Sequence, residues 1–330
     1  DVDHEMDNFT LRARDSGFRR AITESRTLGG RLLVDLSPGG TPLTVGADFQ
    51  QQTKDADRLG NNTDPGHLTA VQSILWPDLT LRQLGLFAEG RTTLASRTQL
   101  IAGMRYDRIA FESGRADERP TMPTMELFRS PNDLYRAFYG TAAKDVAENN
   151  LGGLVRLEYE TAAAVLLSLG VSRTLRTADP TERALANEMG LLSWVGNPGL
   201  KPEQHHQIDL GAAVQRAAWR AGLALYVDRV DDYVFRDAAR GQDDVLLVLP
   251  GADVYRNIDA TLAGAELEAG WVPAGGWRFE LDAAYTHGVN REISAPLAQI
   301  PPLQGPLSAR RSGRLGEIGV RVNAAARQTR

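Results

Sequence analysis

A histidine and a methionine stand two residues apart near the start of the chain, as His4 and Met6. Imidazole nitrogen and thioether sulfur together suit copper, because soft sulfur selects Cu(I) and imidazole binds both oxidation states, whereas hard cations prefer oxygen cages. The flanking residues alternate polar and apolar side chains, which predicts a β-strand on which His4 and Met6 share one face. Both are therefore candidate metal ligands. The simpler alternative is that they only line a polar interior.

Further histidines and methionines could also bind a soft metal ion. Met122 and Met125 lie in a long predicted connection, where exposed thioethers could collect Cu(I). Methionines in such places more often pack a loop against its neighbours, so these two are weaker metal candidates. His205 and His206 are adjacent on a predicted strand and face opposite sides, which prevents them from sharing an ion. We expect both to be rim residues.

The sequence shows no catalytic centre. The segment that begins with Asp55 resembles a calcium-binding loop only at its start, because its fifth position is Leu59 and its twelfth is Gly66. We find no nucleophile elbow, phosphate-binding loop or HExxH motif. Neighbouring acidic and basic residues on predicted strands are expected to form solvated ladders. They are Arg156, Glu158, Glu160, Arg278, Glu280 and Asp282. We predict that the protein is not an enzyme and has no catalytic cofactor.

The elements that must position these residues are long amphipathic strands. Residues 277–285 alternate apolar with mainly polar side chains, and the apolar face begins and ends with an aromatic residue. The same alternation recurs over 100–107, 155–160, 167–172 and 219–228. Strands of ~10 residues with aromatic residues at both ends of the apolar face are typical of transmembrane β-barrels. The alternative is a soluble antiparallel sandwich, whose shorter strands turn their apolar face towards a second sheet.

Short and long connections take turns along the chain. Short turns are predicted near 37–40, 95–97, 161–163, 216–218 and 273–276, and long connections at 55–78, 113–149, 175–202, 237–253 and 290–308. Outer-membrane barrels have short periplasmic turns and long extracellular loops, so the alternation also predicts an orientation. We count about twelve strands, with uncertain boundaries. The predicted ranges are 6–13, 18–36, 43–55, 79–95, 97–112, 149–161, 163–175, 203–216, 218–236, 254–272, 276–290 and 309–325. The predicted fold class is all-β, as part of a transmembrane antiparallel up-and-down β-barrel.

Composition excludes several classes of protein. The 330 residues have a formal net charge of −5 with both signs interspersed, which provides no basic face for nucleic acid. The absence of cysteine excludes disulfides and thiolate metal sites within this stretch. No apolar run reaches the ~18 residues that a transmembrane helix needs, and no leader precedes Asp1. Because the chain starts inside an amphipathic strand, we expect it to be an internal fragment.

Three segments near the end of the chain resemble a known family. Residues 197–203 (NPGLKPE), 255–268 (YRNIDATLAGAELE) and 300–305 (IPPLQG) are similar, in order, to late-barrel motifs of the TonB-dependent outer-membrane receptors. That resemblance implies a barrel of ~22 strands whose lumen is closed by a separate N-terminal plug. We expect residues 1–330 to be a partial β-barrel domain without the plug, the TonB box or the C-terminal strand.

The resemblance implies active transport across the bacterial outer membrane, with TonB acting through the missing N-terminal region. The expected partners are TonB, a metal ion or metal chelate, and outer-membrane lipid. Within the family, residues 3–12 and 148–154 resemble the copper-receptor subgroup, whose barrel supplies a His-x-Met pair and whose plug supplies a Cys-x-x-x-Met pair. The resemblance places His4 and Met6 at the first pair and makes copper the expected cargo. The alternatives are a receptor for a ferric siderophore or another chelate, and a passive channel or outer-membrane enzyme.

Overall fold

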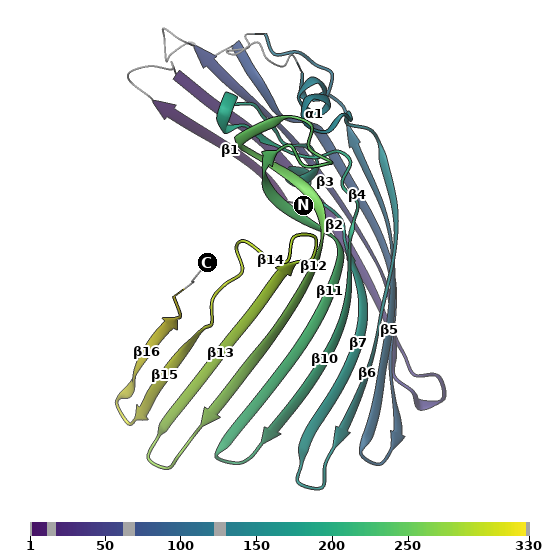
Figure 1. Cartoon of the computed structure of the whole chain (residues 1–330). Helices are drawn as coiled ribbons and strands as arrows, with labels where there is room; N and C mark the ends of the chain where they lie inside the picture. The colour runs from purple at the N-terminus through teal and green to yellow at the C-terminus, as the bar shows by residue number, and fades with distance from the viewer. Residues whose placement is uncertain (1, 12–17, 62–69, 122–129, 328–330) are drawn as a thin grey trace.

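The computed structural model describes residues 2–11, 18–61, 70–121 and 130–327, except for the side chains of residues 2–11, 18 and 61. These residues form one long sheet that curves around an interior (Figure 1). Each strand on the main path pairs with its successor, in the order β1-β2-β3-β4-β5-β6-β7-β10-β11-β12-β13-β15-β16, and all of these pairs are antiparallel. The up-and-down topology predicted from the sequence is confirmed.

The strands of the main path differ widely in length. They are β1 (Val2–Leu11), β2 (Phe18–Leu36), β3 (Leu43–Asn61), β4 (Ala70–Ala95), β5 (Thr98–Ser113), β6 (Val146–Glu160), β7 (Val165–Arg176), β10 (Glu203–Gln215), β11 (Trp219–Arg240), β12 (Val248–Trp271), β13 (Trp277–Asn290), β15 (Gln304–Gly313) and β16 (Gly316–Ala325). Small elements lie in the connections. They are η1 (Pro38–Gly40), α1 (Pro131–Tyr139), α2 (Pro180–Ala184), β8 (Ala186–Asn187), η2 (Gly190–Leu192), β9 (Trp194–Val195) and β14 (Ala295–Pro296).

Each of the first eleven predicted strand ranges overlaps one strand of the structure. The prediction of a single strand over 309–325 is wrong, because β15 and β16 form a hairpin that turns at Arg314 and Leu315. Gly313 pairs with Gly316 across this turn, and Gly316 has a φ of 146°. Glycine accepts such a φ without steric cost, which permits the tight reversal. The predicted connection over 290–308 is correspondingly shorter.

One face of the sheet is apolar and exposed. Trp219, Leu223 and Leu281 point away from the interior and are 45%, 44% and 37% exposed. No second layer covers this face in the part of the chain that the structure describes, so the sandwich alternative is wrong. Among the described residues, no helix is long and apolar enough to cross a membrane. The apolar side chains on this face form what we call the apolar band.

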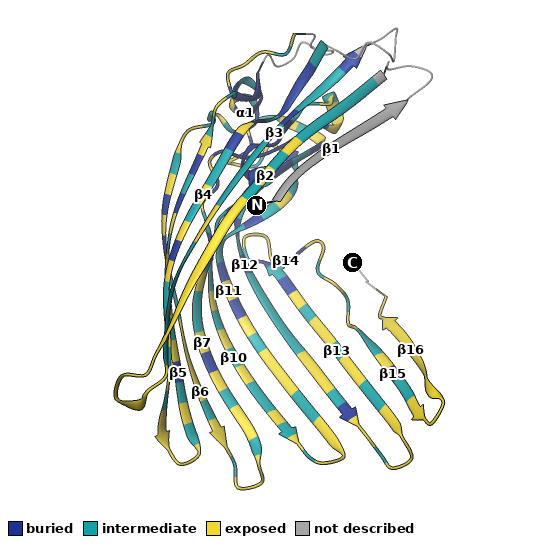
Figure 2. Ribbon diagram, turned by 180° about the vertical axis from the view of Figure 1, so that it is seen from behind, coloured by how far each residue is buried: buried dark blue, intermediate teal, exposed yellow. Residues whose placement is uncertain are grey.

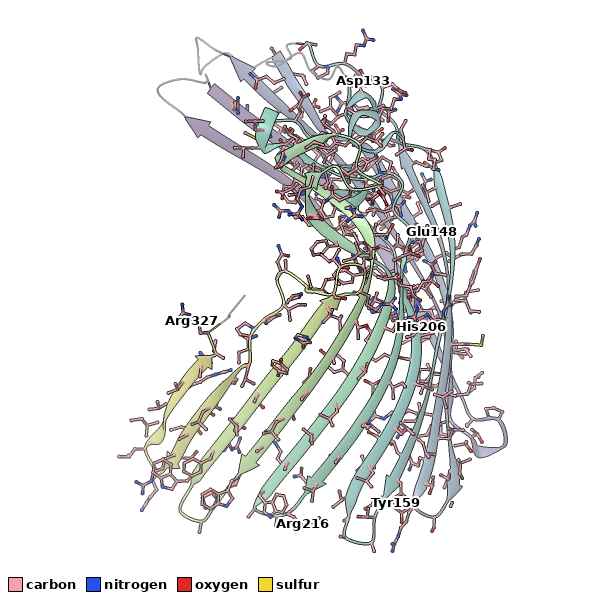
Figure 3. The ribbon with its side chains drawn as sticks, viewed as in Figure 1. Asp133, Glu148, Tyr159, His206, Arg216 and Arg327 are labelled. Carbon is pink, nitrogen blue, oxygen red and sulfur yellow. The ribbon has the colours of Figure 1, made fainter. Side chains whose placement is uncertain are left out.

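The two ends of the sheet differ, as the connection lengths predict. Short turns gather at one end and the longer connections at the other, which we call the long-loop end (Figure 1). Figure 3 shows Tyr159 and Arg216 near the short-turn end and Asp133 at the long-loop end. Buried residues concentrate towards the long-loop end (Figure 2). The interior there is therefore partly filled by protein, whereas the lower part of the sheet stays a single layer.

Helix α1 supplies much of the buried surface at the long-loop end. The Ser130 hydroxyl accepts a hydrogen bond from the Asp133 N–H (3.2 Å), and Pro131 occupies the first turn, where its missing N–H costs nothing. Gly140 ends the helix at a φ of 69°. Tyr135 and Phe138 pack in a cluster with side chains of β9 and β12. This packing fixes the connections against the inner face of the sheet.

Candidate binding site at the long-loop end

Residues 177–202, which we call the crossing loop, connect the neighbouring strands β7 and β10 but contact distant parts of the curved sheet. Within it, β9 pairs in parallel with β12, and Val195 lies opposite Val254. Elements α2 and β8, on the same loop, contact β4. Because β5, β6, β7, β10 and β11 separate β4 from β12 in the sheet, the loop must span the interior. It provides a fixed surface inside the curve of the sheet.

Two of the sequence motifs meet where the crossing loop returns to the sheet. Asn197 donates a hydrogen bond to the Tyr255 carbonyl (3.0 Å) and accepts one from the Gly199 N–H (2.8 Å). Asn257 accepts from the Lys201 N–H (2.9 Å) and donates to the Lys201 carbonyl (3.1 Å). The side chains of Asn197 and Asn257 therefore form hydrogen bonds with backbone groups of the motif segment, which is irregular and has no neighbouring strand to pair with.

Glu203, the last residue of the first motif, is a buried carboxylate that ties the crossing loop to β10. Arg176 donates to both of its oxygens at 2.7 Å, and the Val234 N–H donates to it at 2.8 Å. Burial alone would raise the pKa of Glu203, but hydrogen bonds from Arg176, His205 and Val234 lower it to about 2. Arg176 also donates to Glu182 in α2 (2.9 Å). The Arg176 guanidinium thus joins α2 to β10.

His205 lies between two carboxylates on the inner face. Its Nδ1 is 2.6 Å from Asp228 and its Nε2 is 3.1 Å from Glu203, and the hydrogen bond to Glu203 is the main cause of its raised pKa. Both ring nitrogens are therefore engaged and do not bind a metal ion. His206 is exposed on the opposite face, as predicted. Both histidines lie beyond Ile208, an outward apolar residue of β10, and so outside the apolar band.

Among the described residues, Arg183 is the most deeply buried cation at this end of the sheet. Its side chain is 1% exposed, and its Nη2 lies 2.6 Å from the Glu148 Oε1 on β6. Its Nη1 donates to the Leu200 carbonyl at 2.9 Å. The Tyr135 hydroxyl donates to the Ala184 carbonyl (2.6 Å), which links α1 to α2. A buried ion pair and a buried phenol therefore fix the crossing loop from two sides.

The inner face below the crossing loop is lined with ion pairs. Arg105 donates to Asp48 and Asp107 across β3 and β5, at 2.6–2.8 Å. Arg156 pairs with Glu158 at 3.1 Å, as the predicted ladders require. Every such pair is at least partly solvated, which is the expected lining of a polar interior.

The backbone of β1 places the predicted metal ligands in register with β2. His4 lies opposite Ser25, and Met6 lies opposite Thr23. Ala21, on the same alternation of β2, packs against a cluster that includes residues of the crossing loop. Opposite positions in an antiparallel pair share a face, so positions 4 and 6 belong to the face that the crossing loop covers. The side chains of β1 lie outside the described residues.

Met122 and Met125 lie entirely outside the described residues. Within the part of the chain that the structure describes, no group of three or more His, Cys, Asp or Glu side chains is arranged to hold a metal ion. The carboxylates near the crossing loop instead pair with arginine and histidine. The described inner face therefore lacks the oxygen cage that a hard cation would need.

A group of side chains that the sequence did not single out lies where the crossing loop meets β3. Arg58, opposite Ala21 in the sheet, donates to the Asn187 side chain at 2.7 Å. Burial raises the pKa of the neighbouring Glu188 to about 7, so its carboxyl titrates near neutrality. Met189 follows, partly exposed, with its N–H hydrogen-bonded to the Ser193 hydroxyl (3.0 Å). No spacing rule connects residue 58 with 187–189, because only the folded loop brings them together.

The chain is similar to a known protein family and to several solved structures. A family model described as "TonB dependent receptor-like, beta-barrel" matches residues 3–330. No curated protein sequence matches the chain. Among solved structures, the copper transporter OprC is similar with a TM-score of 0.76 and 24% identity, over 98% of this chain and 47% of that one.

Two receptors of known organisms are also similar. The hemophore receptor HasR of Serratia marcescens has a TM-score of 0.62 and 16% identity, over 94% of this chain and 52% of that one. The ferric yersiniabactin uptake receptor FyuA of Yersinia pestis has a TM-score of 0.65 and 13% identity, over 97% of this chain and 45% of that one. The chain thus spans about half the length of these solved relatives, and at such identities the likeness shows the fold alone.

Proposed function

The chain belongs to the family of TonB-dependent receptor β-barrels, a bacterial outer-membrane transport family, and from this premise we propose that it is the wall of an outer-membrane receptor that takes up copper. TonB would supply the driving force through a segment outside these 330 residues, where the plug would also lie. The membrane lipid would surround the apolar band. The protein would be a transporter and not an enzyme.

The observation that supports copper best is the register of β1. His4 and Met6 occupy neighbouring positions of one face, opposite Ser25 and Thr23, on the side that the crossing loop covers. A nitrogen and a thioether donor at the mouth of a water-filled interior would bind Cu(I) in preference to a hard cation. The carboxylates described nearby are already paired with cations, so they would not compete as an oxygen cage.

Met122 and Met125 would act as weaker, outer capture ligands. In the sequence they follow β5 and precede α1. Copper is also the cargo named for OprC, whose likeness to this chain at 24% identity shows the fold alone.

The test is a copper titration of the intact receptor in detergent under reducing conditions, with a chromophoric Cu(I) chelator as competitor. We expect His4→Ala combined with Met6→Ala to weaken Cu(I) binding at least tenfold. His206→Ala is the matched control, since it removes an exposed imidazole from the opposite face of the sheet, on β10. Unchanged stoichiometry and affinity in the double variant would reject these ligands.

A second candidate cargo is a metal chelate. The solved relatives include a receptor whose title names ferric yersiniabactin. That candidate predicts that wild-type protein binds a ferric siderophore and that free Cu(I) binds no better to it than to the double variant. Parallel titration with both ligands separates the two cargoes.

A further inference from the structure

On three neighbouring strands the apolar band ends in a row of basic residues. Val171, Ile208 and Val227 face outward on β7, β10 and β11 and are about half exposed, at 48%, 54% and 53%. Two residues further towards the long-loop end, each strand places a basic side chain on the same face. These are Arg173, His206 and Arg229, which lie directly opposite one another in the two registers. The His206 ring lies 3.9 Å from the Asp231 carboxylate, so an anionic side chain of the protein already lies in this row.

Some of this charge is compensated within the protein. Arg229 lies 3.2 Å from Asp231, and Arg291 lies 2.8 Å from the same carboxylate. Arg173 differs, because it donates to the Leu151 carbonyl and to the Gln204 amide oxygen (2.8 Å). No carboxylate pairs with Arg173 among the described residues. Its positive charge is therefore not neutralised there.

A second uncompensated arginine lies beside it. Arg108 faces outward on β5 and donates to the Asn149 side-chain oxygen at 2.8 Å. The exposed Tyr106 donates its hydroxyl to the same oxygen at 2.6 Å. Asn149 and Leu151 are two residues apart on β6, so both guanidinium groups approach the same stretch of one strand. Among the described residues Arg108 has no carboxylate partner either.

An apolar groove lies on the same strands, nearer the short-turn end. Its volume is about 390 Å³. Leucines of β6, β7 and β11 form its sides, and the small residues Gly211 and Ala212 on β10 form its floor. The lining includes Leu157, Leu167, Leu169, Leu210, Leu223 and Leu225. These side chains belong to the apolar band, so the groove faces the hydrocarbon and suits an extended acyl chain.

We propose that Arg108 and Arg173 bind a phosphate of a lipid headgroup in the leaflet at the long-loop end, with an acyl chain of the same lipid in the groove. This inference rests on the proposed outer-membrane location. Guanidinium groups form paired, charge-assisted hydrogen bonds with phosphate, and tyrosine is common at the interface where headgroups lie. The patch and the groove together match one amphiphile, whereas free phosphate would use the patch alone.

The test uses intact receptor in neutral-detergent micelles and native mass spectrometry. The probes are a bis-phosphorylated acyl-disaccharide lipid, its dephosphorylated form, and inorganic phosphate. We expect Arg108→Gln combined with Arg173→Gln to reduce retention of the phosphorylated lipid at least tenfold. Ala212→Leu, which fills the groove, should reduce it severalfold. Arg82→Gln is the matched control, because Arg82 is exposed on β4 but pairs with Glu112 at 2.8 Å.

Three results would overturn the inference. They are full retention by the double variant, equal retention of the dephosphorylated lipid, and displacement of the lipid by inorganic phosphate at equal concentration. Copper titration of the same preparations keeps the two proposals apart. If the arginine double variant loses the lipid but still binds copper like wild type, the lipid site is supported independently of the copper site. If wild-type protein binds no copper, the copper proposal fails and the lipid result still holds.

Discussion

Replacing Arg183 by methionine should release the crossing loop from the wall. The guanidinium is 1% exposed and lies 2.6 Å from Glu148, whose own side chain is 8% exposed. Without it, Glu148 keeps only the Thr177 hydroxyl as a donor (2.7 Å), and the Leu200 carbonyl loses its partner. Removing one member of a buried pair costs about 3–5 kcal/mol. Since each 1.4 kcal/mol is about tenfold, local opening of the loop should increase roughly 10²- to 4 × 10³-fold.

Hydrogen exchange of the intact protein in detergent, read by mass spectrometry, measures this opening directly. Peptides from 177–202 should exchange faster by that factor in Arg183→Met, whereas peptides from β13 serve as the internal control. Adding Glu148→Leu removes the stranded carboxylate, so the double variant should regain much of the protection. Exchange within twofold of wild type in Arg183→Met would refute the assignment of the pair as the main anchor.

Three further predictions concern the network, the outer face and the loop backbone. Because the pKa of Glu203 is lowered to about 2, its ionised carboxylate stabilises the fold above about pH 4.5, and this stabilisation is lost as the pH falls through 2. Because the pKa of His205 is raised, its protonated ring stabilises the fold below about pH 6.5, and this stabilisation is lost at higher pH. Protection of the crossing loop should therefore peak between about pH 4.5 and 6.5, and Glu203→Gln should flatten this profile in hydrogen exchange. Leu281→Arg puts a charge midway along an outward apolar face and should lower the free energy of unfolding in lipid by about 2–4 kcal/mol, measured by urea titration in vesicles; a cost below 1 kcal/mol would contradict membrane burial. Gly196→Ala would place a Cβ 2.6 Å from the Leu185 nitrogen and should destabilise the loop by about 1–3 kcal/mol, seen as faster exchange of 177–202 only; Gly222→Ala, with open space around it, is the control.

The strands could be predicted because a single local rule determines them. Alternation with a period of two identifies β2 and β13 almost to the residue, since each side chain either meets the outside or the interior. The rule fails at Gly313 to Gly316, where the alternation runs straight through a two-residue turn. It also starts β4 too late in the sequence, at residue 79 and not at Ala70, because the first residues of β4 pair with β3 through irregular register shifts.

The candidate site was less predictable because its contacts join distant parts of the chain. Arg183 pairs with Glu148, 35 residues away, and Arg58 reaches Asn187, 129 residues away. Nothing in the local pattern of these segments distinguishes a buried arginine from a solvated one. Burial by the crossing loop creates the difference, and it exists only after the sheet has curved.

The structure distinguishes residues that anchor the crossing loop from residues that are free to bind a ligand, and the sequence alone does not. An irregular segment inside a water-filled interior gains little from apolar burial, so polar contacts such as those of Asn197 and Glu203 must hold it in place. Residues of the motif are therefore anchors, and ligand contacts should come from positions that the anchors leave free, such as 4 and 6 on β1. The two kinds of variant should therefore have separate effects. Arg183→Met should accelerate hydrogen exchange of the crossing loop, whereas His4→Ala with Met6→Ala should weaken copper binding and leave that exchange unchanged. If the ligand variants also loosened the loop, His4 and Met6 would be structural, and the copper proposal would lose its basis.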